Sequence, residues 1–199
     1  STIKDSLPFF TSRVSVLTIE KTNILLLGTF LGYSEVAYYD LAQKIVVLLK
    51  APFQVVNQVL FPNVSRTKNI SQVRNILKVL IFIYVIGYAL LYIIGEDLVM
   101  ILGGGDLLPS VPLLFVLAIS SITELVSVFL GAPMLLVMGY KKEYNQSIIF
   151  GSLFYLVLIL LLYVFNFIGI YSLAIVIVLT SLFIMFYRYI YCRKYSLIK

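Results

Sequence analysis

The sequence lacks histidine and tryptophan, and Cys192 is its only cysteine. The absence of histidine excludes histidine-based metal sites and histidine general bases. One cysteine cannot form a disulfide within the chain. Charged residues make up only 12% of the sequence, about half the share of a soluble domain, and nine acidic residues face fifteen basic ones. We therefore expect neither a metal site nor a bound cofactor.

Apolar residues dominate what is present, at 61% of the chain, and the mean hydropathy is +1.05. Such a composition would leave a large apolar surface in water, so we expect lipid as the solvent. A bilayer core about 30 Å thick needs about 20 apolar residues in a helix, and helices satisfy their own backbone there. The predicted fold class is all-α, a polytopic membrane bundle of six transmembrane helices. The predicted spans are residues 8–31, 38–61, 77–94, 111–138, 147–165 and 169–187.

The charged residues outside these spans differ in sign from loop to loop. Four segments are basic, beginning with the one before the first span, and they hold Lys4, Arg66, Lys68, Arg74, Lys78, Lys141, Lys142, Arg188, Arg193, Lys194 and Lys199. The alternate loops hold Glu35, Glu96, Asp97 and Asp106 and no lysine or arginine. The positive-inside rule therefore predicts that both termini face the cytoplasm. The basic residues behind the net charge of +6 lie beside apolar runs, as in the cytoplasmic loops of membrane proteins. We therefore expect no nucleic-acid partner.

Two features of the longer segments bear on local structure. The fourth span is long enough to tilt or to kink at Pro133. The glycine run 103–105 lacks the strand before it and the GK[ST] after it that a phosphate loop requires. We therefore expect an outer turn there, with Leu98–Leu102 as a short interfacial helix beside it.

The first two spans carry charged side chains, although a charge near the bilayer centre costs roughly 2.5–3.5 kcal/mol. At about 100° per residue, the polar residues gather within an arc of roughly 160° on the first span and 140° on the second. One face of each helix is therefore expected to meet water or protein. These polar residues are Arg13, Glu20, Lys21 and Asn23 on the first span and Asp40, Gln43, Lys44, Lys50, Gln54, Asn57 and Gln58 on the second.

Cations outnumber anions on these two faces by four to two, which favours a hydrated cavity that passes an anionic group. The remaining polar residues would line this cavity. The alternative is a set of ion pairs that hold the two helices together, with Lys50 paired to Glu20 or Asp40. The residues predicted to bind the anionic head group are Arg13, Lys21, Lys44 and Lys50.

The fourth span carries one further charge, Glu124, on a stripe with Ser120 and Ser127. Two interpretations remain open for it. Glu124 pairs with a cavity lysine as a structural contact, or it binds a coupling proton or sodium ion.

Four runs of the sequence are distinctive: GTFLGYSEVAYYDLAQKI (28–45), APFQVVNQVLFPNVSR (51–66), GAPMLLVMGYKKEYNQS (131–147) and IGIYSLAIVIVLTS (168–181). They resemble the O-antigen flippases of the Wzx type, in the multidrug/oligosaccharidyl-lipid/polysaccharide exporter superfamily, which has a MATE-like fold. The resemblance implies the C-terminal lobe of a two-lobe transporter, with a preceding N-terminal lobe of six spans as its partner. It also implies the cargo, an undecaprenyl-pyrophosphate-linked oligosaccharide repeat unit flipped across the bacterial inner membrane by alternating access.

Two other functions compete with this one. A membrane-embedded polysaccharide polymerase or transferase needs reactive groups in a large aqueous loop. The longest outer loop, about 95–110, offers only three carboxylates, so we expect no enzymatic activity. A drug or ion antiporter of the same fold is the second rival, but cationic drugs favour an acidic cavity, whereas this one is basic.

Overall fold

The computed structural model describes residues 14, 19 and 22–198, and the regular secondary structure of that part of the chain is all helix, with no strand. Residues 22–30 lie in a helix that precedes the first turn. Short helical segments, η1 and η2, lie before and after α4. The helices are α2 (Tyr33–Thr67), α3 (Ile70–Gly103), η1 (Gly105–Leu107), α4 (Ser110–Phe129), η2 (Leu130–Leu136), α5 (Lys141–Val164) and α6 (Ile170–Lys194).

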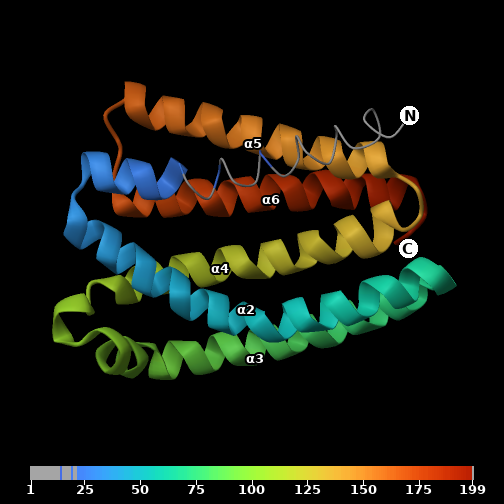
Figure 1. The fold of residues 1–199 in the computed structure, drawn as a ribbon, viewed down its shortest axis with the longest axis horizontal. Helices are drawn as coiled ribbons and strands as arrows, with labels where there is room; N and C mark the ends of the chain where they lie inside the picture. The colour runs from blue at the N-terminus through green and yellow to red at the C-terminus, as the bar shows by residue number, and fades with distance from the viewer. Residues whose placement is uncertain (1–13, 15–18, 20–21, 199) are drawn as a thin grey trace.

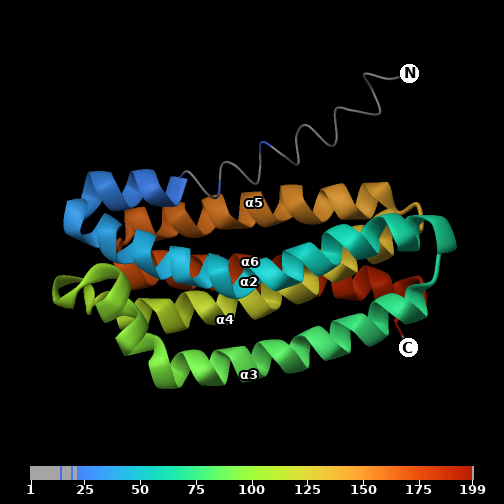
Figure 2. The same cartoon turned by 60° about the horizontal axis from the view of Figure 1, so that its bottom comes forward.

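The long helices run up and down beside one another, with α4 in the middle of the bundle (Figures 1 and 2). Helix α4 packs against α2, α3 and α6, and α5 packs on the outer side of α6. In both views α3 and α5 lie at opposite edges of the bundle. Helix α4 is therefore the part of the chain best shielded from lipid, and a polar site can be enclosed around it.

The chain is an all-helical, multi-pass membrane protein, as the sequence predicted. Five helices in the described part are long and apolar enough to cross a membrane. The predicted first span lies only partly within the described residues. Large apolar side chains such as Phe82, Ile93, Leu153 and Leu160 stand exposed on α3 and α5. Because exposed side chains of this kind suit hydrocarbon rather than water, these two faces are lipid-facing.

The helices extend well beyond the apolar runs from which the spans were predicted. Arg66 lies in the last turn of α2, and Arg74 lies in α3 rather than in a loop. Glu96 and Asp97 are likewise helical. Hydropathy detects only the segment that fits the hydrocarbon core, whereas a helix continues into the polar interface. Leu98–Leu102 is the end of α3, so the prediction of a separate interfacial helix was wrong.

The glycine run does form a turn. Gly104 ends α3 with a φ of +76°, a conformation that glycine adopts without steric cost. A single 3-10 turn, η1, then leads into α4.

The basic turns gather at one end of the bundle (Figure 1). The ammonium group of Lys68, between α2 and α3, donates to the carbonyl oxygen of Val137 near the start of α5. Tyr195 follows α6, stacks on Tyr140 with 3.7 Å between ring centroids, and donates a 2.7 Å hydrogen bond to Glu143. This hydrogen bond is the main reason why the pKa of Tyr195 is raised to about 12. The phenol is therefore neutral at neutral pH. The opposite end carries the acidic residues of η1 and the end of α3.

The predicted irregularity at Pro133 is a π-helix, η2, that continues α4. Proline lacks an N–H donor, so it interrupts the α-helical hydrogen-bond ladder at its own position. π-helical turns of this kind occur often at functional sites. Here a side chain of α6 adds a donor just before the turn, as described below.

Candidate functional site

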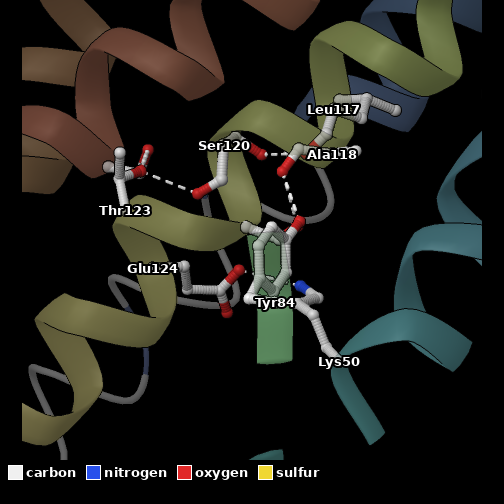
Figure 3. A network of polar contacts seen from close by, with 9 residues as sticks. Lys50, Tyr84, Leu117, Ala118, Ser120, Thr123 and Glu124 are labelled. Atoms are coloured by element: carbon white, nitrogen blue, oxygen red, sulfur yellow. Dashed lines mark hydrogen bonds and ion pairs between the residues drawn. The ribbon is translucent and has the colours of Figure 1, made fainter. Parts of the chain in front are cut away.

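An ion pair joins the middle of α2 to α4. Lys50 is the central residue of the 35-residue helix α2, and its ammonium nitrogen lies 2.8 Å from a carboxylate oxygen of Glu124 (Figure 3). The side chain of Lys50 is 21% exposed and that of Glu124 is 49% exposed. Because neither group is sealed in, water or a ligand can reach the pair.

The smaller of two cavities opens beside this pair. Its volume is about 270 Å³, and it lies between α2 and α4. The side-chain oxygen of Asn57 is buried there without a hydrogen-bond partner in the described part of the chain. Its polar lining consists of Lys50, Gln54, Asn57, Gln58, Ser121 and Glu124.

A tyrosine from α3 supports the wall of this cavity (Figure 3). The hydroxyl of Tyr84 donates to the carbonyl oxygen of Ala118 over 2.6 Å and lies 2.5 Å from the hydroxyl of Ser121. Tyr84 itself is 1% exposed. The hydrogen bonds fix α3 against α4 one turn before Glu124, and thereby fix the position from which Glu124 reaches Lys50.

The larger cavity, of about 390 Å³, lies on the other side of the pair. Side chains from α2, α4, α5 and α6 line it, together with residues from the helix before α2. Its polar lining consists of Asn23, Tyr39, Gln43, Lys50, Ser120, Glu124, Ser127, Tyr144, Thr180, Ser181 and Arg188. Lys50 and Glu124 line both cavities, so the ion pair stands where the two meet.

Asn23 anchors the helix of residues 22–30 at the wall of the larger cavity. Its amide nitrogen lies 3.3 Å from the hydroxyl of Tyr39, and its oxygen accepts a 2.5 Å hydrogen bond from Tyr155. On the facing wall the hydroxyl of Thr123 lies 2.5 Å from that of Ser181. Both contacts tie different helices together by side-chain hydrogen bonds, as expected where lipid gives no hydrophobic drive for association.

The predicted cavity residues divide into three groups. Gln43 lines the larger cavity, and Gln54, Asn57 and Gln58 line the smaller one. Lys44 and Asp40 line neither of these cavities. They pair with each other over 2.6 Å, one helical turn apart, with side chains 71% and 57% exposed. The predicted residues Arg13, Glu20 and Lys21 lie outside the described residues.

Glu124 pairs with a cavity lysine, Lys50, which is one of the two interpretations left open for it, and a coupling-ion role stays a prediction. Of the two partners named for Lys50, Asp40 pairs with Lys44 instead, and Glu20 lies outside the described residues. The stripe that Glu124 was predicted to share with Ser120 and Ser127 faces the larger cavity. In the described part of the chain, no three acidic, histidine or cysteine side chains cluster as a metal site would require.

Sequence reasoning missed Arg188, which it placed in the basic tail after the sixth span. Arg188 lies inside α6 and is only 6% exposed. Its Nε donates to the hydroxyl of Ser147 over 2.8 Å, and its Nη1 donates to the carbonyl oxygen of Ser127 over 2.8 Å and to its hydroxyl over 3.1 Å. The guanidinium also lies over the ring of Tyr144, 4.9 Å from its centroid.

The sequence did hold a signal for Arg188. The residues after it, Tyr189, Ile190 and Tyr191, continue an apolar helical run, so the span does not end at residue 187. Gly131 supplies the space, because a Cβ there would lie 2.6 Å from Nη1 of Arg188. Arg188 thus adds a second donor to the Ser127 carbonyl oxygen, which also accepts from the backbone N–H of Leu130.

A family model described as polysaccharide biosynthesis protein matches residues 2–112. The matched region includes α2 with Lys50 and α3 with Tyr84, whereas Glu124 and Arg188 lie beyond it. No curated protein and no solved structure matches the chain. The match covers more than half of the 199 residues and fits a role in polysaccharide synthesis or export. The chain therefore belongs to the polysaccharide biosynthesis protein family.

Proposed function

We propose that the protein transports a lipid-linked oligosaccharide repeat unit, joined to undecaprenyl through a pyrophosphate, across the bacterial inner membrane. The observation that carries this proposal is the Lys50–Glu124 pair, set at the middle of α2 beside two cavities that both hold polar side chains. Charged and polar side chains inside a membrane bundle are costly and usually mark the path of a polar substrate or ion. Membership of a polysaccharide biosynthesis family supports a saccharide cargo.

Lys50 suits the pyrophosphate of such a cargo. Charge-assisted hydrogen bonds from an ammonium group to phosphate oxygens are about twice as strong as neutral ones. The half-buried position of Lys50 strengthens them further, because the local dielectric is lower than that of water. The lipid tail can stay in the bilayer while the head group passes the cavity by alternating access. No covalent step is required, so we propose a transporter rather than an enzyme.

Glu124 gives this transporter a route to ion coupling. Lys50 cannot hold a pyrophosphate and Glu124 equally well at the same time, because both compete for one ammonium group. Cargo binding therefore leaves Glu124 without its cation, and a proton or sodium ion can then neutralise it. Release of that ion on the other side would return Glu124 to Lys50 and expel the cargo.

We further propose that this chain is the C-terminal lobe of a two-lobe transporter. Polar side chains such as Gln54 and Gln58 stand exposed on α2, where lipid alone would leave them unsatisfied. A preceding N-terminal lobe would cover them. Expressed alone, the chain should be degraded or aggregate, and co-expression of the first lobe should rescue it. A monodisperse, thermally stable 199-residue protein would contradict this arrangement.

The basic end of the bundle is proposed to face the cytoplasm. Asp106 lies in η1 and Lys141 begins α5 at the opposite end. In a Cys192→Ser background, Asp106→Cys should react with an impermeant thiol reagent in intact spheroplasts, and Lys141→Cys should not. The reverse labelling pattern would overturn this orientation.

The test of transport is the effect of Lys50 on surface polysaccharide. Lys50→Ala should abolish display while the amount of protein in the membrane stays normal, and Lys50→Arg should keep part of the display because charge survives. Lys78→Ala serves as the matched control, since Lys78 is exposed on α3 and lines neither cavity.

A double variant, Lys50→Ala with Glu124→Ala, distinguishes cargo binding from helix pairing. If Lys50 only neutralises Glu124, then Lys50→Ala leaves a lone carboxylate, and adding Glu124→Ala should restore both abundance and display. If Lys50 binds the cargo, the double variant stays inactive. Recovery of display in the double variant would therefore overturn the proposal.

A further inference from the structure

Arg188 is a buried charge without a counter-charge in the described part of the chain. No carboxylate there lies within ion-pair distance of it, although it is only 6% exposed. A buried charge is costly unless it is paired. Nε and Nη1 are occupied by Ser147 and Ser127, but Nη2 makes no hydrogen bond to any described residue. Among the described residues the guanidinium therefore has no counter-charge, and Nη2 keeps its donor capacity for a ligand.

A second unsatisfied group lies on the same face of α6. Thr180 is only 3% exposed. Its hydroxyl is buried and has no hydrogen-bond partner in the described part of the chain. Thr180 and Arg188 both line the larger cavity, and so does Ile184 between them. Residues spaced by four on a helix share a face, and the arginine side chain leans toward the N-terminal end of its helix, which is the direction of Thr180.

The depth of Arg188 differs from that of Lys50. Arg188 lies six residues before the end of α6, about 9 Å along the helix axis from the basic end of the bundle. Lys50 lies at the centre of α2. Among its described lining residues, the larger cavity therefore has one cation near the basic end and one near the middle, and Glu124 pairs with the second.

We propose that the end of the larger cavity at Arg188 is a binding site for a phosphate-type oxyanion. Arg188 supplies the charge and a pair of N–H donors from Nη2, and Thr180 supplies a hydroxyl donor. Gly131 keeps the space for the guanidinium open. The proposal rests on the proposed function where it takes the cargo's pyrophosphate as the ligand, which would meet Arg188 before it reaches Lys50.

Two sources could supply this oxyanion, a free phosphate or pyrophosphate and the head group of a lipid. The test is isothermal titration calorimetry on the intact protein in detergent, first with sodium pyrophosphate and then with undecaprenyl pyrophosphate. Arg188→Lys should weaken binding about ten-fold or more, because it removes the planar pair of charge-assisted donors. Arg193→Lys is the matched control, since Arg193 is exposed near the end of the same helix.

Thr180→Val keeps the test decisive if Arg188→Lys fails to fold. The Thr180 hydroxyl has no partner in the described part of the chain, so the isosteric change leaves no described acceptor unsatisfied. It should weaken pyrophosphate binding about three-fold, the effect of one ordinary hydrogen bond. Equal affinity in the wild type, Thr180→Val and Arg188→Lys would overturn the site. Absence of binding of either ligand to the wild type would overturn it as well.

The two ligands identify the source, and the transport assay separates this site from the proposed function. If undecaprenyl pyrophosphate displaces inorganic pyrophosphate and both weaken in Arg188→Lys, the site takes a lipid head group. If only the inorganic anion binds and weakens, the site takes a free anion. If these losses appear while Lys50→Ala displays normal surface polysaccharide, the Arg188 site stands and the transport proposal fails. Lys50→Ala could instead lose surface display while pyrophosphate affinity stays unchanged in both Arg188→Lys and Thr180→Val. That result would refute the Arg188 site and leave the transport proposal standing.

Discussion

Lys50 and Arg188 line the same cavity, yet the protein holds them in opposite ways. Lys50 reaches a carboxylate, Glu124, and both partners keep contact with the cavity space. Arg188 is only 6% exposed and is held by uncharged oxygens of Ser127 and Ser147. A partly exposed ion pair contributes little to stability and exchanges partners readily. A buried guanidinium on backbone and hydroxyl oxygens is costly to disturb, so it is a fixed part of the fold.

The difference separates two properties that a transporter needs. A cation that must release its cargo should have a competing anion nearby, and Lys50 has one. A cation that must keep its geometry through the cycle should be tied to the backbone, and Arg188 is tied to the turn where α4 becomes a π-helix. Substitutions at Arg188 should therefore act first on stability, and substitutions at Lys50 or Glu124 should act first on binding and transport.

The largest effect on stability is expected from Arg188→Met. This change removes the guanidinium hydrogen bonds to the Ser127 carbonyl and the Ser147 hydroxyl, and a hydrogen bond from a charged donor contributes about 1.5–3 kcal/mol. The thermal midpoint in detergent should fall by at least about 4 °C. Arg193→Met, at an exposed position on the same helix, should leave it unchanged. Equal midpoints in the two variants would show that Arg188 is not part of the fold in the way described.

A smaller loss of stability is expected from Tyr84→Phe. The hydroxyl of Tyr84 contacts Ala118 and Ser121 behind the Lys50–Glu124 pair. A side-chain hydrogen bond between membrane helices contributes about 0.6 kcal/mol on average, so the midpoint should fall by about 1–2 °C. Transport should fall less than in Lys50→Ala, because both charges remain. An unchanged midpoint would remove Tyr84 as the support of α4.

Glu124→Gln should sharpen the account of competition at Lys50. The change removes the charge that competes with the cargo but keeps the shape of the side chain. Undecaprenyl pyrophosphate should bind about 1.4- to five-fold more tightly, which corresponds to the roughly 0.2–1 kcal/mol of a solvent-accessible ion pair. Transport should slow at the same time, because release is no longer assisted. Weaker binding in Glu124→Gln would mean that the carboxylate orients Lys50 rather than competing for it.

The smallest effect is expected from Lys44→Ala. Sequence reasoning assigned Lys44 to cargo binding, but its partner Asp40 is exposed and the pair lines neither cavity. An exposed pair one helical turn apart is worth about 0.3–0.5 kcal/mol. Midpoint and surface display should both stay close to wild type. A loss of display as complete as that of Lys50→Ala would move the cargo path to the outer face of α2.

The fold was largely predictable because the bilayer imposes it. Apolar runs of about 20 residues mark membrane helices. The charges of the turns predict which side of the membrane each turn faces. The ends of α2 and α3 were not predictable from hydropathy, since Arg66 and Glu96 lie in helical turns that continue past the hydrocarbon. The π-helix around Pro133 was foreseen only as a place where the fourth span would bend.

The site was predictable in composition but not in its contacts. Helical periodicity placed Lys50, Gln54, Asn57 and Gln58 on one face, and the structure lines the smaller cavity with them. Periodicity cannot choose between partners on other helices, so the pairing of Lys50 with Glu124 had to come from the packing of α2 on α4. Arg188 was assigned to the tail because a charge near an apolar run lies more often at the end of the membrane span than inside it.

The central claim is that Lys50 holds the anionic head group as it passes through the protein. Its most direct test is a translocation assay with the intact protein in proteoliposomes, using a fluorescent undecaprenyl-pyrophosphate oligosaccharide and measuring its transfer between leaflets. The wild type should transfer it, Lys50→Ala should not, Lys50→Arg should do so slowly, and Lys78→Ala should match the wild type. Transfer by Lys50→Ala at the wild-type rate, or its recovery in the double variant with Glu124→Ala, would contradict the account.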